Sequence, residues 1–241
     1  MTALFAHRGH SAEAPENTLA AFKAAVGSGA AGVELDVQLS RDGHPMVIHD
    51  EHLERTTNGQ GPVGALTRAE LERLDAGGWF GPVYRGEPVP ALETVLDLLA
   101  PTGLLVNVEL KTLRVPYPGL VQAVVKLVRA RGLEARVILS SFNHHSLVEA
   151  ARLAPELERG ALLYAGLVEP WHYARRAGFG ALHVSFPTVD ETLAAGCWEA
   201  GVRLRAYVVD DPAVARRLRA LRVDAIFTNA PRRLAAHLAE G

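Results

Sequence analysis

Short runs of β-branched and other apolar residues alternate along the chain with longer segments that carry apolar residues at helical spacing. Segments with the period of amphipathic helices include 19–26, 121–129, 148–153 and 214–221. Eight short runs have the length and composition of β-strands: 4–7, 33–37, 105–110, 137–140, 161–164, 181–185, 204–209 and 225–228. This alternation predicts parallel strands joined by crossover helices, which is an α/β fold.

Eight such units in 241 residues predict a single (β/α)8 barrel of the TIM type, because these barrels take roughly 250 residues. An open, doubly wound sheet is the alternative for the same order of elements. In that fold a glycine-rich fingerprint follows the first strand, whereas His7-Arg8-Gly9 stands there in this chain. We therefore expect one barrel domain over residues 1–241.

A hairpin interrupts the repeat after the second strand. The apolar run 46–49 follows the second strand too closely for a crossover helix, so it predicts an antiparallel partner. Asp42 and Gly43 have the composition of a two-residue hairpin turn. With that turn, Asp36 would lie directly opposite His49, and the two side chains would share one face of the hairpin.

Residues 51–90 form a second interruption, which is rich in glycine and proline. Its one helical patch, 67–74, begins with Thr67 and Glu70 at the spacing of a capping box. The segment is too short for a hydrophobic core of its own. We expect it to be an insertion over the barrel mouth.

Charged side chains stand at or near the carboxyl ends of the first three barrel strands, where α/β barrels carry their catalytic residues. Glu34 and Asp36 are two residues apart, so they share a face of their strand, as do Glu109 and Lys111. Three converging carboxylates repel one another unless a cation joins them, and Mg²⁺ and Ca²⁺ prefer oxygen ligands. The pattern predicts a site for one divalent metal ion, Mg²⁺ or Ca²⁺, at Glu34, Asp36 and Glu109.

Two cations and two imidazoles complete this set of groups, which is typical of phosphoryl transfer. Arg8 and Lys111 would neutralise phosphate oxygens, and His7 and His49 would transfer protons. Further residues are candidates for lining a substrate pocket: Trp79, Phe80, Phe142, His183 and Tyr207. The aromatic residues of the insertion have the alternative of packing within the insertion itself.

Composition narrows the class of protein. A formal net charge of -2 and a pI near 6.6 argue against nucleic-acid binding, which requires a basic face. The single cysteine, Cys197, is compatible with a reducing cytoplasm. Residues 1–10 lack the pattern of a signal peptide, and no apolar run reaches the length of a membrane span, so we expect a cytoplasmic location without a stable membrane anchor. The sequence leaves open whether the chain forms a homodimer.

Seven motifs occur in order along nearly the whole chain: 7–9, 14–18, 33–37, 47–57, 107–111, 140–142 and 224–231. In these motifs the chain resembles the glycerophosphodiester phosphodiesterase family. The resemblance implies a (β/α)8 barrel with an insertion after the second strand and Glu34, Asp36 and Glu109 as ligands of Mg²⁺ or Ca²⁺. It also implies His7 and His49 as the general acid and base pair. The implied reaction is hydrolysis of a small-molecule glycerophosphodiester to sn-glycerol 3-phosphate and an alcohol.

One position departs from the family pattern. Asp210 stands where family members often carry Asn, and this acid changes the contacts expected on that side of the pocket. Two other functions are compatible with such a barrel. A phospholipase D-like enzyme of the same superfamily would act on choline-bearing lysolipids, but those enzymes usually carry a signal peptide and disulfides. A silent barrel that only binds phosphorylated metabolites would have lost a metal ligand or a catalytic histidine, and all of these residues are present.

Overall fold

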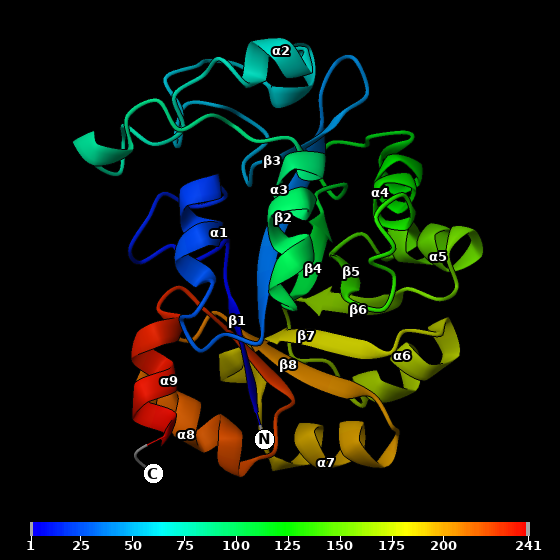
Figure 1. The fold of residues 1–241 in the computed structure, drawn as a ribbon. Helices are drawn as coiled ribbons and strands as arrows, with labels where there is room; N and C mark the ends of the chain where they lie inside the picture. The colour runs from blue at the N-terminus through cyan, green and yellow to red at the C-terminus, as the bar shows by residue number, and fades with distance from the viewer. Residues whose placement is uncertain (1, 240–241) are drawn as a thin grey trace.

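The computed structural model describes residues 2–239 and closes eight parallel strands into a barrel (Figure 1). The barrel strands are β1 (Ala3–Ala6), β2 (Gly32–Leu39), β4 (Leu105–Leu110), β5 (Val137–Ser141), β6 (Glu158–Leu163), β7 (Ala181–Ser185), β8 (Arg203–Tyr207) and β9 (Ala225–Thr228). β1 pairs with β9 on one side and with β2 on the other, which closes the sheet. The predicted barrel is confirmed, and the open sheet is not formed by residues 2–239.

Helices cover the outside of the barrel (Figure 1). They are α1 (Leu19–Ala25), α3 (Leu92–Leu99), α4 (Leu120–Arg129), α5 (His144–Leu153), α6 (Pro170–Ala177), α7 (Glu191–Glu199), α8 (Pro212–Ala220) and α9 (Pro231–Ala239). Thr18 caps α1 by accepting a hydrogen bond from the Ala21 backbone N–H. Within residues 2–239, no helix combines the length and the hydrophobicity that crossing a membrane requires.

The barrel has an interior core separate from the larger core between strands and helices. Phe5 from β1, Ile138 from β5 and Phe227 from β9 belong to one buried cluster. β5 is not a neighbour of β1 or β9, so this cluster spans the inside of the barrel. The space beyond it, toward the carboxyl ends of the strands, is left for polar side chains.

The hairpin forms, but its predicted register is wrong. β3 (Pro45–Val47) pairs antiparallel with β2, and Val37 lies opposite Val47. Gly43 has a φ of 84° and Asp42 has a negative φ, so the loop is a three-residue turn and the two-residue type with two left-handed positions is not formed. The longer loop shifts the register by one residue. Ile48, rather than His49, therefore donates its N–H to the Asp36 carbonyl, at 3.0 Å.

The insertion contains α2 (Arg68–Leu71) and two short 3₁₀ turns, Val63–Ala65 and Pro82–Tyr84. The predicted capping box at Thr67 and Glu70 is confirmed. Figure 1 shows the segment in cyan beyond β3, above α1 and α3. It shares a small buried core with residues that flank it: Met46, Ile48, Leu53, Val63, Leu71, Ala76, Val89 and Ala91. The hairpin and the start of α3 supply part of this core, so the insertion shares its buried residues with the segments that flank it.

Candidate active site

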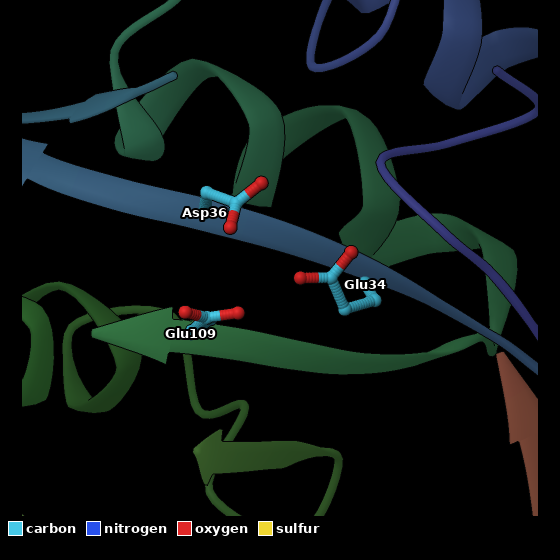
Figure 2. A group of neighbouring side chains, drawn as sticks. All are labelled: Glu34, Asp36 and Glu109. Carbon is cyan, nitrogen blue, oxygen red and sulfur yellow. The ribbon is translucent and has the colours of Figure 1, made fainter. Parts of the chain in front are cut away.

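Three carboxylates meet inside the carboxyl end of the barrel. Glu34 and Asp36 come from β2 and Glu109 from β4, and Figure 2 shows their carboxyl groups facing the same space. The parallel register pairs Asp36 with Glu109, which brings the strands' polar residues to the same height. One oxygen of each carboxylate lies within 4.8 Å of the others. The residues predicted to hold a metal ion are thus brought together.

Burial and mutual repulsion set the charge of this cluster. Burial, together with Asp36 and Glu109, raises the pKa of Glu34 well above its usual range. Burial and the charge of Asp36 raise the pKa of Glu109 to about 7. Burial also acts to raise the pKa of Asp36, but Lys111 and Arg8 outweigh it and hold that pKa below its usual range. Asp36 therefore stays ionised, whereas Glu34 and Glu109 hold their protons more strongly than ordinary carboxyl groups.

Lys111 and Arg8 flank the carboxylates. Lys111 Nζ lies 2.9 Å from Glu109 Oε1 and 3.6 Å from Asp36 Oδ1. The Arg8 guanidinium lies 3.3 Å from Asp36 and 2.8 Å from Glu16, and the Arg8 backbone N–H donates to Glu34 at 2.9 Å. Both basic side chains, Arg8 and Lys111, therefore lie at the site, as the sequence analysis expected. That they bind phosphate stays a prediction.

His7 lies at the end of β1 beside the acids. Its Nε2 is 4.0 Å from Glu34 Oε2, and its Nδ1 is 2.8 Å from Asn229 Oδ1. Burial and the neighbouring Arg8 lower the pKa of His7 to about 4. The ring is therefore neutral near pH 7, with one nitrogen able to accept a proton.

His49 is held from the opposite side by a chain of charges. Its Nδ1 lies 2.6 Å from Asp50 Oδ1, and Arg55 contacts Asp50 at 2.5 Å and Glu16 at 2.7 Å. Burial acts to raise the pKa of Asp50, but hydrogen bonds from Arg55 and His49 outweigh it and hold that pKa at about 2. The sequence argument placed His49 at the site because it expected Asp36 and His49 to lie opposite each other in the hairpin, and this register is not formed. His49 reaches the site from the residues that follow β3.

A cavity of about 240 Å³ opens above the barrel core, and both histidines, Glu34, Glu109 and Lys111 line it. Phe142, predicted for the pocket, stacks on Tyr164 with ring centroids 3.8 Å apart. Tyr207, also predicted, meets Phe142 edge-on at 6.1 Å. Tyr164 was missed by the sequence argument, although an aromatic residue at the end of a barrel strand was a signal for it.

A second cavity of about 330 Å³ adjoins the first and adds Asp50, Glu51 and His52 to its walls. Residues that line both cavities are His49, Glu109, Lys111, Phe142 and Tyr164. The two cavities therefore meet beside Glu109 and Lys111.

His183 lines the first cavity from within the barrel and is fully buried. Its Nε2 accepts a hydrogen bond from Arg205 at 3.0 Å, and burial with this cation lowers the pKa of His183 well below its usual range. Trp79 and Phe80 line neither cavity. Their ring centroids lie 5.6 Å apart, and the ring centroids of Phe80 and Tyr84 lie 5.5 Å apart. Trp79 and Phe80 thus pack within the insertion and do not form a wall of either cavity, as the pocket expectation required.

Two amides complete the site and were given no role by the sequence argument. Asn17 donates its Nδ2–H to Asp36 Oδ2 at 2.9 Å, and Asn229 contacts His7. Both residues lie inside motifs that the sequence analysis singled out, 14–18 and 224–231. Their position in those motifs was a signal that they belong to the site. Their hydrogen-bond partners, Asp36 and His7, are distant in sequence and could not be identified from it.

Comparison with known proteins identifies the family. The model of the glycerophosphoryl diester phosphodiesterase family matches residues 7–233. A glycerophosphodiester phosphodiesterase of Caldanaerobacter subterraneus subsp. tengcongensis is 45% identical over 97% of this chain and 96% of its own length. A relative of the same name from Bacillus altitudinis is 36% identical over 97% and 96%.

Solved structures agree with this assignment. An Oleispira antarctica phosphodiesterase in complex with the product sn-glycerol-3-phosphate superposes with a TM-score of 0.92 at 33% identity, over 99% of this chain and 97% of that one. A glycerophosphodiester phosphodiesterase of Agrobacterium tumefaciens gives a TM-score of 0.85 at 34% identity, over 98% and 100%. With its barrel, its acid cluster and these relatives, the chain belongs to the glycerophosphoryl diester phosphodiesterase family.

Proposed function

We propose that this enzyme hydrolyses glycerophosphodiesters to sn-glycerol 3-phosphate and an alcohol, with one divalent metal ion held by Glu34, Asp36 and Glu109. The observation that carries the proposal is one cavity lined by buried carboxylates, two histidines and two cations. The relatives support the same reaction, since one of them was solved with sn-glycerol-3-phosphate as its product.

The acid cluster fits a hard cation. Its donors are all carboxylate oxygens, and burial together with the neighbouring acids raises the pKa values of Glu34 and Glu109, an effect that a bound cation would oppose. Fully ionised, the three acids exceed the charges of Arg8 and Lys111 by one, and Arg8 is shared with Glu16, so the cluster favours a further positive charge. Mg²⁺ or Ca²⁺ bound there would polarise a phosphate oxygen.

The histidines supply the proton transfers that diester hydrolysis needs. One ring must take a proton from the attacking group and the other must give one to the leaving alcohol oxygen. Each ring is held through Nδ1, His7 by Asn229 and His49 by Asp50, which leaves Nε2 for the transfer. Arg8 and Lys111 are placed to neutralise charge on the phosphate.

Further parts of the proposal rest on the sequence. We propose a single domain with residues 51–90 as an insertion at the barrel mouth, a cytoplasmic location consistent with the lone Cys197, and no binding of nucleic acid. Light scattering on the purified protein distinguishes a monomer from a homodimer.

The test is product release by metal-stripped protein given Mg²⁺ or Ca²⁺ and a panel of glycerophosphocholine, glycerophosphoethanolamine and glycerophosphoglycerol. We expect sn-glycerol 3-phosphate from at least one substrate and kcat lower by roughly 10² to 10⁴ in His7→Ala and His49→Ala. His172→Ala, at an exposed histidine of α6 that lines neither cavity, is the matched control. Choline release from a lysolipid with no reaction on the panel would instead indicate the phospholipase D-like enzyme. Binding of glycerol 3-phosphate without turnover would indicate a silent barrel.

A further inference from the structure

Asp210 follows β8 at the carboxyl end of the barrel, and both of its carboxylate oxygens accept hydrogen bonds. Oδ1 accepts from the Thr228 hydroxyl at 2.7 Å and from the Asn229 backbone N–H at 2.8 Å. Oδ2 accepts from the Asn229 side-chain Nδ2 at 2.7 Å. Oδ1 therefore stabilises the turn after β9, and Oδ2 holds the side chain of Asn229.

The second contact fixes how the Asn229 amide points. An ionised carboxylate only accepts hydrogen bonds, so the Asn229 NH2 group must face Asp210 and its Oδ1 must face away. On that side Oδ1 lies 2.9 Å from Ser11 Oγ and 2.8 Å from His7 Nδ1. Since an amide oxygen also only accepts, His7 Nδ1 must carry the proton. The neutral ring then has its lone pair on Nε2, the nitrogen nearer to Glu34.

We propose that Asp210 is a positioning residue for this reaction, which acts through Asn229 to fix the tautomer and the ring orientation of His7. This inference rests on the proposed function, in which His7 transfers a proton. It also gives a role to the acid that departs from the family pattern at position 210. The partner of Asp210 in this chain is an amide, and the NH2 group of that amide needs an acceptor.

Asp210→Asn changes one oxygen to an NH2 group and leaves the shape of the side chain unchanged. We assume that the remaining oxygen at position 210 still accepts from Thr228 and from the Asn229 backbone N–H. The new NH2 group then faces the NH2 group of Asn229, and the Asn229 amide must rotate by 180° about its last side-chain bond. The Asn229 oxygen then accepts from the new amide at position 210, and the Asn229 NH2 group donates to His7 Nδ1 and Ser11 Oγ. The Thr228 hydroxyl and the Asn229 backbone N–H keep their acceptor, and Ser11 Oγ still donates to the His7 carbonyl, so the variant is expected to fold. The His7 proton, however, must move to Nε2, which removes the lone pair used for catalysis.

The experiment combines kinetics with ¹⁵N NMR of the histidine rings at about pH 8, where a neutral histidine shows its tautomer. We expect the wild-type protein to carry the His7 proton on Nδ1 and Asp210→Asn to carry it on Nε2. We also expect kcat to fall by about 10² or more, while KM changes less. Asp211→Asn makes the same change one residue away, at the N-cap of α8, and should alter neither readout.

Adding Asn229→Asp to Asp210→Asn reverses the two groups. The new amide at 210 donates to the new acid at 229, which again accepts from His7 Nδ1. This double variant should restore the Nδ1 tautomer and recover kcat at least about 10-fold. In an Asn229→Ala background the link to His7 is already cut, so Asp210→Asn should then lower kcat no further.

Three results would overturn the proposal: an unchanged tautomer in Asp210→Asn, no recovery of either readout in the double variant, or an undiminished effect of Asp210→Asn in the Asn229→Ala background. If Asp210→Asn does not fold, Asp210→Ala removes the acceptor of the Asn229 NH2 group, and an unchanged His7 tautomer with unchanged kcat in that variant would overturn the proposal. Wild-type protein that releases no glycerol 3-phosphate would contradict the proposed function. The tautomer measurement would then still test the link from Asp210 to His7.

Discussion

Asp36 is the residue at which the charged side chains of the site converge. Asn17 and Arg8 contact its Oδ2, and Lys111 contacts its Oδ1. From Arg8 the ion pairs continue through Glu16, Arg55 and Asp50 to His49. Arg55, which belongs to the insertion, thereby links the loop after β1 to His49.

Arg55 should stabilise the protein at neutral pH and lose this effect in acid. It holds Asp50 at a pKa of about 2, below its usual value, so its contribution is present above about pH 4 and is lost as the pH falls toward 2. We expect Arg55→Met to lower the free energy of unfolding at pH 7 by about 1 kcal/mol, a value reduced for the partial exposure of these groups. Urea unfolding of both proteins should show the difference narrowing at pH 3.

Arg114→Met is the control for Arg55→Met. Arg114 is 78% exposed and lies 3.7 Å from Glu51, so its removal should have little effect at any pH. A difference between wild type and Arg55→Met that is constant from pH 7 to pH 3 would contradict the linkage to Asp50.

The aromatic wall of the cavity should select the alcohol group. Phe142 stacks on Tyr164 where the two cavities meet, whereas Trp79 packs on Phe80 in the insertion. We expect Phe142→Ala to change the ratio of kcat/KM between two glycerophosphodiesters by about 10-fold to 200-fold, the usual effect of apolar contacts. Trp79→Ala should leave that ratio unchanged. A changed ratio in Trp79→Ala with an unchanged ratio in Phe142→Ala would instead show that the insertion selects the alcohol group.

Among the strands, β6 and β7 depend on each other for the polar layer inside the barrel. Gly160 of β6 faces His183 of β7, and a Cβ at Gly160 would lie 2.3 Å from His183 Nε2. The same Nε2 accepts the hydrogen bond from Arg205, which also pairs with Glu158. The absence of a side chain at Gly160 is therefore a packing requirement, independent of backbone conformation.

Gly160→Ala should destabilise the barrel by about 1 to 3 kcal/mol, because the methyl group must displace the buried imidazole. Gly180→Ala provides the comparison, since its Cβ would lie 3.7 Å from the nearest atom, an ordinary contact. Chemical denaturation measures both. A loss of the same size in the two variants would indicate a general cost of removing glycine instead of a steric conflict with His183.

For the molecule as a whole, closure of the barrel assembles the site. β1 pairs with both β2 and β9, and these pairings place His7 between Glu34 of β2 and Asn229 after β9. The acids of β2 and β4 meet for the same reason, since those strands are neighbours. The site therefore exists only in the folded chain, and an ion bound to it should stabilise folding.

Metal binding should be measurable as stability. At a free Mg²⁺ or Ca²⁺ concentration about 100 times the Kd, the free energy of unfolding should rise by about 2.7 kcal/mol, and chelation should remove both this gain and activity. Glu109→Gln should lose most of the gain, while Glu156→Gln, a surface change, should keep it. Equal stabilisation of wild type and Glu109→Gln would place the ion elsewhere.

The sequence by itself determined the features that depend on local periodicity. Eight apolar runs separated by helical segments were enough to predict the barrel, and two-residue spacing was enough to place Glu34 and Asp36 on one face. The capping box at Thr67 and Glu70 followed from residue type and position alone.

Only the tertiary structure decided the features that depend on a single backbone angle or on distant partners. The hairpin register depended on Gly43 alone taking a left-handed conformation, which no residue pattern distinguishes from a two-residue turn. The choice of Phe142 over Trp79 as a cavity wall depended on how loops pack. The link from Asp210 through Asn229 to His7 joins residues more than two hundred positions apart, and barrel closure brings them within hydrogen-bonding distance.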